Sequence, residues 1–156
     1  VFMEPGGTIV RSAGFVVATV IDIIGPKNAK VAVLDTTVNH MPEVYEYQYE
    51  PNVFGTYDIE KDEEGLGFDE LHQYMLAGAS CLAGDQFGTH YYKKPLKIGE
   101  RVIFLNMGSY TLVKAQMFNG INLPSIYFVD KNDEVRLERE FTYEDFLVHV
   151  TPASAE

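Results

Sequence analysis

The sequence has little cysteine, little positive charge and no long hydrophobic run. Its single cysteine, Cys81, cannot form an internal disulfide, which favours a reducing compartment, and we expect a cytoplasmic protein. The 12 lysines and arginines face 23 aspartates and glutamates, giving a net charge of −11 at pH 7. Nucleic acids and anionic membrane surfaces both attract clustered positive charge, so we expect neither as a partner. The sequence also lacks a membrane-span-length apolar run and a signal-peptide pattern.

What is present suggests one compact β domain. A chain of 156 residues that is 46% hydrophobic is large enough to bury one core. The opening VFMEPGG has no initiator methionine and enters a turn directly, which suggests the end of a strand from a preceding domain. We therefore expect residues 1–156 to form one domain of a larger enzyme.

Several segments have the composition of strands, and few have a helical pattern. Strands are predicted within residues 8–25, 30–39, 44–50 and 95–108, and in both arms of a hairpin at 125–141. Residues 58–69 are acidic and predicted to form a solvated loop, 142–149 a closing helical turn, and 70–78 either a helix or a strand. This pattern predicts a mainly β fold, an antiparallel barrel or sandwich.

Cys81 is the first candidate for chemistry. Its neighbours in GASCLAGDQFG (residues 78–88) are small, so the thiol could face a pocket as a proton donor or nucleophile. The alternative is a buried cysteine that acts as a small hydrophobic side chain. Cys81, Asp85 and His90 lack the paired spacing of metal ligands, so no metal site is predicted.

Three further motifs carry candidate polar groups. Glu4 in EPGG could present its carboxylate to a ligand at a strand end, or simply face solvent in a turn. His40 and Glu43 in NHMPEV could project into one cleft. The hydroxyl of Tyr110 could reach a phosphate, or its ring could lie in the core.

These motifs together resemble one family. EPGG, NHMPEV, SCLAGD and FNGINLPSI occur in this order and span most of the chain. The series is similar to the C-terminal β domain of the pyridoxal-phosphate decarboxylases that share the alanine racemase fold (fold type III). Within that group it most resembles carboxynorspermidine (carboxyspermidine) decarboxylases, which act in polyamine biosynthesis.

The resemblance implies a two-domain enzyme. Residues 1–10 would end an N-terminal (β/α)8 barrel that supplies the lysine binding pyridoxal 5'-phosphate covalently. None of the eight lysines of this chain lies in such a motif, so this chain alone is expected to be inactive. The resemblance also implies a homodimer with shared active sites.

The resemblance also implies roles for single residues. Glu4 would pair with the pyridine nitrogen of the cofactor, and Tyr110 would donate a hydrogen bond to its phosphate. Cys81 would reach into the neighbouring subunit and protonate the α-carbon of the substrate after CO2 leaves. Asp85 would support the Cys81 loop or bind the distal amine of the substrate.

The residues near Glu43 bear on the substrate class. Diaminopimelate decarboxylases have an arginine near this point for the second carboxylate of their substrate, whereas this chain has Met41, Pro42 and Glu43. A glutamate binds an ammonium group, so Glu43, with His40 and Asp85, is predicted to bind a small cationic amino acid of the polyamine type.

Two alternatives remain open at this point. One is a diaminopimelate decarboxylase-like enzyme. The other is a non-catalytic binding or regulatory domain derived from the same fold. It is suggested by the missing lysine and by Gly7, where related enzymes carry arginine or an acidic residue.

Overall fold

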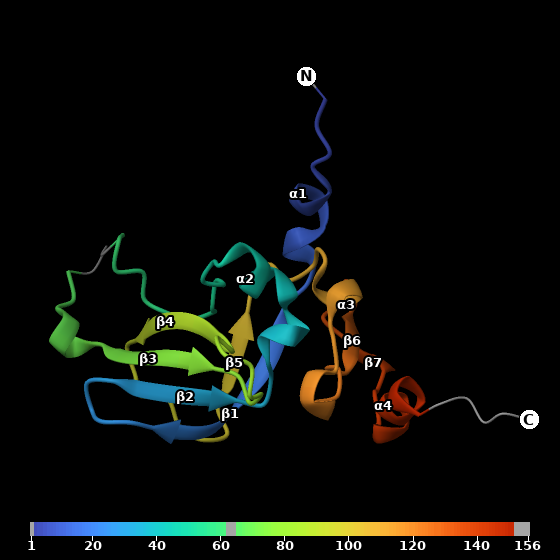
Figure 1. The fold of residues 1–156 in the computed structure, drawn as a ribbon. Helices are drawn as coiled ribbons and strands as arrows, with labels where there is room; N and C mark the ends of the chain where they lie inside the picture. The colour runs from blue at the N-terminus through green and yellow to red at the C-terminus, as the bar shows by residue number, and fades with distance from the viewer. Residues whose placement is uncertain (1, 62–64, 152–156) are drawn as a thin grey trace, which may run out of the picture.

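A five-stranded sheet forms the body of the protein. The structure, a computed structural model, describes residues 2–61 and 65–151. Figure 1 shows the sheet on one side of the molecule and a smaller unit, made of a hairpin and the last helix, on the other. The strands of the sheet lie in the order β4-β3-β2-β1-β5. They are β1 (Val16–Ile24), β2 (Lys30–Leu34), β3 (His72–Ala77), β4 (Gln86–Tyr92) and β5 (Arg101–Phe104).

The sheet is mixed, because β2 and β3 pair in parallel while its other neighbours are antiparallel. A parallel pair needs a long crossover, and here the connection runs from residue 35 to residue 71. This crossover carries helix α2 (Pro42–Tyr47) and the 3-10 turns η2 (Val38–His40) and η3 (Phe68–Glu70). The prediction of a mainly β domain is therefore confirmed, with one parallel pair in place of purely antiparallel pairing.

The crossover also joins the two outer strands of the sheet. The carbonyl of Asn52 accepts a hydrogen bond from the amide of Leu105 at 2.8 Å. The amide of Phe54 donates to the carbonyl of Ile103 on β5 at 2.9 Å. Farther along, the amide of Tyr57 donates to the carbonyl of Tyr91 on β4 at 2.7 Å. One segment thus bonds both edges, which gives the sheet its curled, barrel-like form.

The core lies inside the curled sheet. Phe87 on β4 and Phe104 on β5 are fully buried, and their ring centroids are 4.8 Å apart. Leu34 and Leu76 fill the centre from the parallel pair. Strands contribute alternate residues to this core, as expected for a sheet with one covered face.

The second unit follows the sheet in sequence. It contains helix α3 (Thr111–Lys114), η4 (Phe118–Gly120), strands β6 (Ile126–Val129) and β7 (Val135–Arg139), and helix α4 (Tyr143–Val150). The predicted hairpin at 125–141 and the closing helix at 142–149 are confirmed, and the ambiguous segment 70–78 forms strand β3. Within the predicted loop at 58–69, residues 62–64 lie outside the described residues.

The prediction of a strand beginning at residue 8 is wrong for its first part. Residues Gly6–Val10 form helix α1 and Arg11–Ala13 form the 3-10 turn η1, before β1 begins at Val16. The β-branched composition favours a strand, but Gly14 lets this segment pack against the backbone of Gly108. Tertiary packing has here overridden local preference.

The strand predicted at 44–50 is also wrong, because most of this segment belongs to α2. Pro42 occupies the first helical turn, where its missing amide hydrogen costs nothing, and Gln48 ends the helix in the left-handed conformation (φ 52°). Met41 and Val44 are buried three positions apart, which is helical spacing. The alternation of Tyr45, Tyr47 and Tyr49 with polar residues favours a strand and outweighed this helical spacing in the prediction.

Candidate active site

The N-terminal segment and the segment that carries Tyr110 are packed together. The amide of Met107 donates to the carbonyl of Gly14 at 2.8 Å, and that of Gly108 to the carbonyl of Arg11 at 2.9 Å. The guanidinium of Arg11 lies 5.7 Å from the centre of the Tyr49 ring. The segment from Arg11 to Gly14, directly after helix α1, is therefore held by the Met107–Gly108 backbone and by Tyr49.

Glu4 and Tyr110 are both exposed beside this contact. A β-carbon added at Gly7 would lie 3.4 Å from the Oγ of Ser109, so the chain just after Glu4 adjoins the residue just before Tyr110. Tyr110 is the N-cap residue directly before helix α3, and the amino group of Lys114 lies 5.8 Å from the centre of its ring. Because the side chain of Tyr110 is exposed, the alternative that its ring lies in the core is excluded. A carboxylate and a phenol are thus carried on neighbouring segments.

Cys81 is exposed on the loop between β3 and β4. This exposure excludes the alternative that Cys81 is a buried, small hydrophobic side chain. Asp85 holds this loop from within. Its Oδ2 accepts hydrogen bonds from the amide of Ser80 at 2.9 Å and from the hydroxyl of Ser80. Its Oδ1 accepts from the amide of Val38 at 2.8 Å, which ties the Cys81 loop to η2.

Gly78 explains why the carboxylate of Asp85 can enter the interior. A β-carbon at Gly78 would overlap that carboxylate, so only glycine leaves the space. Asp85 is 7% exposed, and each of its oxygens accepts a hydrogen bond inside the chain, which compensates the cost of burying the charge. In this geometry Asp85 acts on the loop, and a contact with a substrate amine remains a prediction.

His40 lies at the end of η2 and is 3% exposed. Its Nδ1 lies 3.0 Å from the Oγ1 of Thr36, while its buried Nε2 makes no hydrogen bond to the described residues. Burial lowers the pKa of His40 below its ordinary value, against the raising effects of the Ile121 backbone and the Asp85 carboxylate. His40 is therefore an interior group in this chain, and its predicted contact with a substrate is not tested by this arrangement.

The buried imidazole predicts a pH dependence of stability. Because the folded pKa of His40 is below its unfolded value of about 6.5, the unfolded chain binds more protons between the two values. Stability due to His40 is therefore complete above pH 6.5 and falls as the pH drops, by at most about 1.4 kcal/mol per pH unit. Urea unfolding of wild type and His40→Gln between pH 7.5 and 5 checks this, and the variant should show the smaller slope.

The exposed His149 provides the matched control. His149→Gln alters only an exposed side chain and should keep the wild-type slope. Equal slopes for wild type and His40→Gln would contradict the burial argument.

Glu43 is half-buried in the first turn of α2. Glu46, one turn later, forms an ion pair with Lys114 of α3, and this contact raises the pKa of Lys114. The amide of Gln116 donates to the carbonyl of Asn39 at 2.9 Å, next to His40. Helix α2 and η2 are therefore fixed to the segment that follows Tyr110.

Residues 107–119, which we call the linking segment, contact every region that holds a predicted site residue. The amides at its start donate hydrogen bonds to the N-terminal segment. In its middle, Lys114 forms the ion pair with α2 and Gln116 donates a hydrogen bond to η2. Its end reaches the Cys81 loop, where the Oδ1 of Asn119 accepts a hydrogen bond from the amide of Cys81 at 3.1 Å. Three regions far apart in sequence are thus connected through the segment that carries Tyr110.

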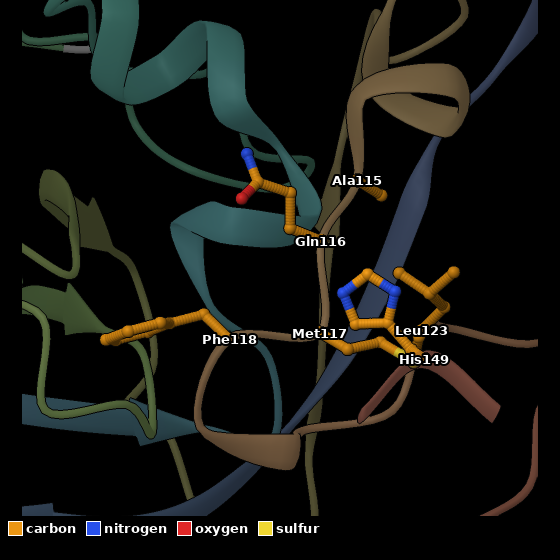
Figure 2. A pocket seen from close by; sticks show the side chains of 6 residues that line it. All are labelled: Ala115, Gln116, Met117, Phe118, Leu123 and His149. Carbon is orange, nitrogen blue, oxygen red and sulfur yellow. The ribbon is translucent and has the colours of Figure 1, made fainter. Parts of the chain in front are cut away.

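Two cavities border the linking segment. The smaller, about 210 Å³, lies between η2, α2 and the Cys81 loop; its lining residues are Val38, Asn39, Pro42, Tyr45, Glu46, Leu82 and Gln116. The larger, about 510 Å³, lies beside α4; it is lined by Ala115, Gln116, Met117, Phe118, Leu123 and His149. Figure 2 shows Leu123 and His149 on one side of the linking segment and Gln116 and Phe118 pointing to the other.

Sequence reasoning missed two members of this arrangement, Ser80 and Asn119. Ser80 belongs to SCLAGD, where a hydroxyl beside a buried aspartate is a usable signal. Asn119 precedes Gly120, and both have positive φ, so the pair NG marked a tight turn. Nothing local indicated that Asn119 would reach Cys81.

Among the described residues, no group of three or more His, Cys, Asp or Glu side chains could hold a metal ion. Within residues 2–61 and 65–151, no helix combines the length and apolar character needed to cross a membrane.

Comparison with known proteins defines the class to which the chain belongs. Residues 8–108 match the family described as pyridoxal-dependent decarboxylase, C-terminal sheet domain, and the chain belongs to this family. It is 37% identical over 151 residues to a carboxynorspermidine/carboxyspermidine decarboxylase of Campylobacter jejuni, covering 94% of this chain and 39% of that protein. It is 38% identical over 145 residues to a carboxyaminopropylagmatine decarboxylase of a Synechocystis species, covering 92% of this chain and 35% of that protein.

Solved structures agree with this assignment. Carboxynorspermidine decarboxylase from C. jejuni, complexed with norspermidine, superposes with a TM-score of 0.82 and 35% identity, covering 94% of this chain and 41% of that one. A diaminopimelate decarboxylase from M. jannaschii, in complex with L-lysine, has a TM-score of 0.75 at 22% identity, with 96% and 32% covered, which shows the shared fold alone. The chain spans less than half the length of these relatives.

Proposed function

We propose that this chain is the C-terminal domain of a cytoplasmic, pyridoxal-phosphate-dependent decarboxylase that acts on a carboxylated polyamine. Carboxynorspermidine and carboxyspermidine are the first candidates, and carboxyaminopropylagmatine is the second. The observation that carries the proposal is 37–38% identity to decarboxylases of these names over more than nine tenths of the chain. The share of those relatives covered, 35–39%, leaves room for a barrel domain before residue 1 that would supply the cofactor lysine.

The exposed groups on the N-terminal and linking segments suit pyridoxal phosphate. Bound there, this cofactor would supply a sink for the electron pair left when CO2 departs. Glu4 would hold a proton at the ring nitrogen by pairing its carboxylate with it. Tyr110 would donate its hydroxyl hydrogen to a phosphate oxygen.

The remaining residues would handle the substrate and its proton. Cys81, on an exposed loop, would deliver a proton to the α-carbon in the active site of a second subunit of a homodimer. Glu43 would bind a distal ammonium, and the acidic chain would favour the approach of a polycation. Asp85 and His40 would fix the two segments that carry Cys81 and Glu43.

The proposal is tested by measuring CO2 release from the complete protein with pyridoxal phosphate and each candidate substrate. We expect turnover of a carboxylated triamine or of carboxyaminopropylagmatine, and little or none of meso-diaminopimelate. Release from diaminopimelate alone would replace the proposal with a diaminopimelate decarboxylase. Absence of release from all of them would favour a non-catalytic domain.

In the same assay, Glu43→Gln should raise KM for the polyamine substrate about tenfold or more, because a charge-assisted hydrogen bond to ammonium is lost. Cofactor affinity should stay within about twofold of wild type, since Glu43 is assigned to the substrate. Glu140→Gln, at an exposed position after β7, is the control and should leave KM nearly unchanged, because Glu140 is not assigned to the site. Equal KM for Glu43→Gln and wild type would remove Glu43 from the site.

A further inference from the structure

The peptide that carries Cys81 is held from two directions. On the interior side, the carboxylate of Asp85 binds the amide of Ser80 at 2.9 Å. On the exposed side, the side chain of Asn119 accepts from the amide of Cys81 itself at 3.1 Å. Two consecutive amides of an otherwise exposed loop are thus fixed by side chains from different parts of the chain.

The geometry of Asn119 aims its side chain at this loop. Its backbone is in the left-handed region (φ 60°, ψ 15°), which asparagine tolerates better than most residues. The turn is closed by a hydrogen bond from the amide of Gly120 to the carbonyl of Met117 at 3.0 Å. On its far side, a β-carbon at Gly120 would touch the ring of Phe146 in α4 at 3.4 Å. The turn is therefore packed in place, and Asn119 is presented from a fixed base.

We propose that Asn119 is a positioning residue for the Cys81 thiol, acting through the hydrogen bond from the Cys81 amide to its Oδ1. This inference rests on the proposed function, in which Cys81 donates a proton to the substrate. The orientation of the Cys81 peptide plane determines the direction of its Cα–Cβ bond, and so the reach of its Sγ. Proton transfer requires approach to hydrogen-bond distance, so a small displacement of the thiol slows it markedly.

Two substitutions separate positioning from turn formation. Asn119→Gly removes the acceptor and keeps the left-handed backbone, since glycine adopts positive φ freely. Asn119→Asp keeps an oxygen at Oδ1 and also tolerates this conformation. A role limited to the turn predicts that both variants behave as wild type, whereas the positioning role predicts that only Asn119→Gly changes the Cys81 loop.

The experiment uses the complete protein with pyridoxal phosphate and measures hydrogen exchange of the Cys81 amide. We expect exchange in Asn119→Gly to be about fivefold faster or more, the change expected from one lost hydrogen bond, and exchange in Asn119→Asp to remain near wild type. Under steady-state assay, kcat of Asn119→Gly should fall about tenfold with KM within about twofold. Thermal midpoints of both variants should match, which separates a local effect from loss of fold.

Unchanged Cys81 exchange in a folded Asn119→Gly protein would overturn the inference, as would equal acceleration in Asn119→Asp. Faster exchange with unchanged kcat would also overturn it, because the thiol would then not depend on the bond. If the protein releases no CO2 from any candidate, the proposed function fails. The exchange measurements then decide by themselves whether Asn119 holds the Cys81 peptide.

Discussion

Replacing Cys81 with alanine is expected to lower kcat for CO2 release at least about 100-fold in the complete protein, since general acid catalysis contributes on the order of 10²–10⁴ in rate. The thiol is exposed at the tip of a loop whose amides are fixed by Asp85 and Asn119. Its removal deletes no buried group, so fold and cofactor affinity should be retained. Steady-state CO2 release and the absorbance of the bound cofactor measure the two effects separately.

The neighbouring residue Ala83 provides the matched control for this experiment. It is also exposed in the Cys81 loop, and Ala83→Ser adds one hydroxyl without touching the Asp85 contacts. Turnover of Ala83→Ser should equal that of wild type. If Cys81→Ala also turns over at the wild-type rate, Cys81 has no part in the reaction, and another group must deliver the proton.

The second large effect is expected from Gly108→Ala. A β-carbon at Gly108 would overlap the carbonyl oxygen of Val10 and lie 2.9 Å from the amide nitrogen of Gly14. Both atoms belong to the backbone, so no side-chain rotation can relieve the clash. We expect a loss of about 3 kcal/mol in the free energy of unfolding, at the upper end of overpacking effects, measured by urea denaturation.

The same change should weaken binding of pyridoxal phosphate. The clash separates the N-terminal segment from the linking segment, and these carry Glu4 and Tyr110. Titration of the apoprotein with the cofactor measures this effect. Gly67→Ala is the control, because φ at Gly67 is −67° and none of the described residues lies within 4 Å of its added β-carbon. A Gly108→Ala protein as stable as Gly67→Ala would show that the two segments do not depend on close packing.

Local patterns predicted the elements whose signals lie within a few residues. The hairpin of β6 and β7 was predictable because strand-forming residues flank the turn Lys131-Asn132-Asp133, and Asp133 has the positive φ such turns use. The helix α4 follows Thr142, a capping residue whose box with Asp145 is present. Both signals are local and independent of the rest of the fold.

Errors arose where distant packing decides local structure. Helix α1 occupies a β-branched segment because its surroundings, above all the backbone of Gly108, determine its shape. In α2 the tyrosine alternation outweighed Pro42, although a proline followed by an acidic residue is a helix-start signal. The parallel pairing of β2 with β3 joins residues 44 positions apart, such as Lys30 and Tyr74, and has no local signature.

The candidate residues were found by motif resemblance, but their connections were not. The contact of Asp85 with Val38 spans 47 positions, and that of Cys81 with Asn119 spans 38. Such contacts follow from the complete fold and cannot be deduced from spacing. Motifs therefore identified the members of the candidate site, and the fold identified the side chains that hold them.

The parallel pair also sets an order of events during synthesis. His40 and Glu43 follow β2 and leave the ribosome well before β3, and β2 has no parallel neighbour until residues 72–77 have been synthesised. The hydrogen bond from Val38 to Asp85 forms later still. The hydrogen bonds that Gln116 makes with Asn39 and Asn119 makes with Cys81 form last. Long-range pairing of this kind is slow, so the candidate site would form only after residue 119 has been synthesised. A nascent chain released before residue 119 would carry most of the core strands but a loose Cys81 loop.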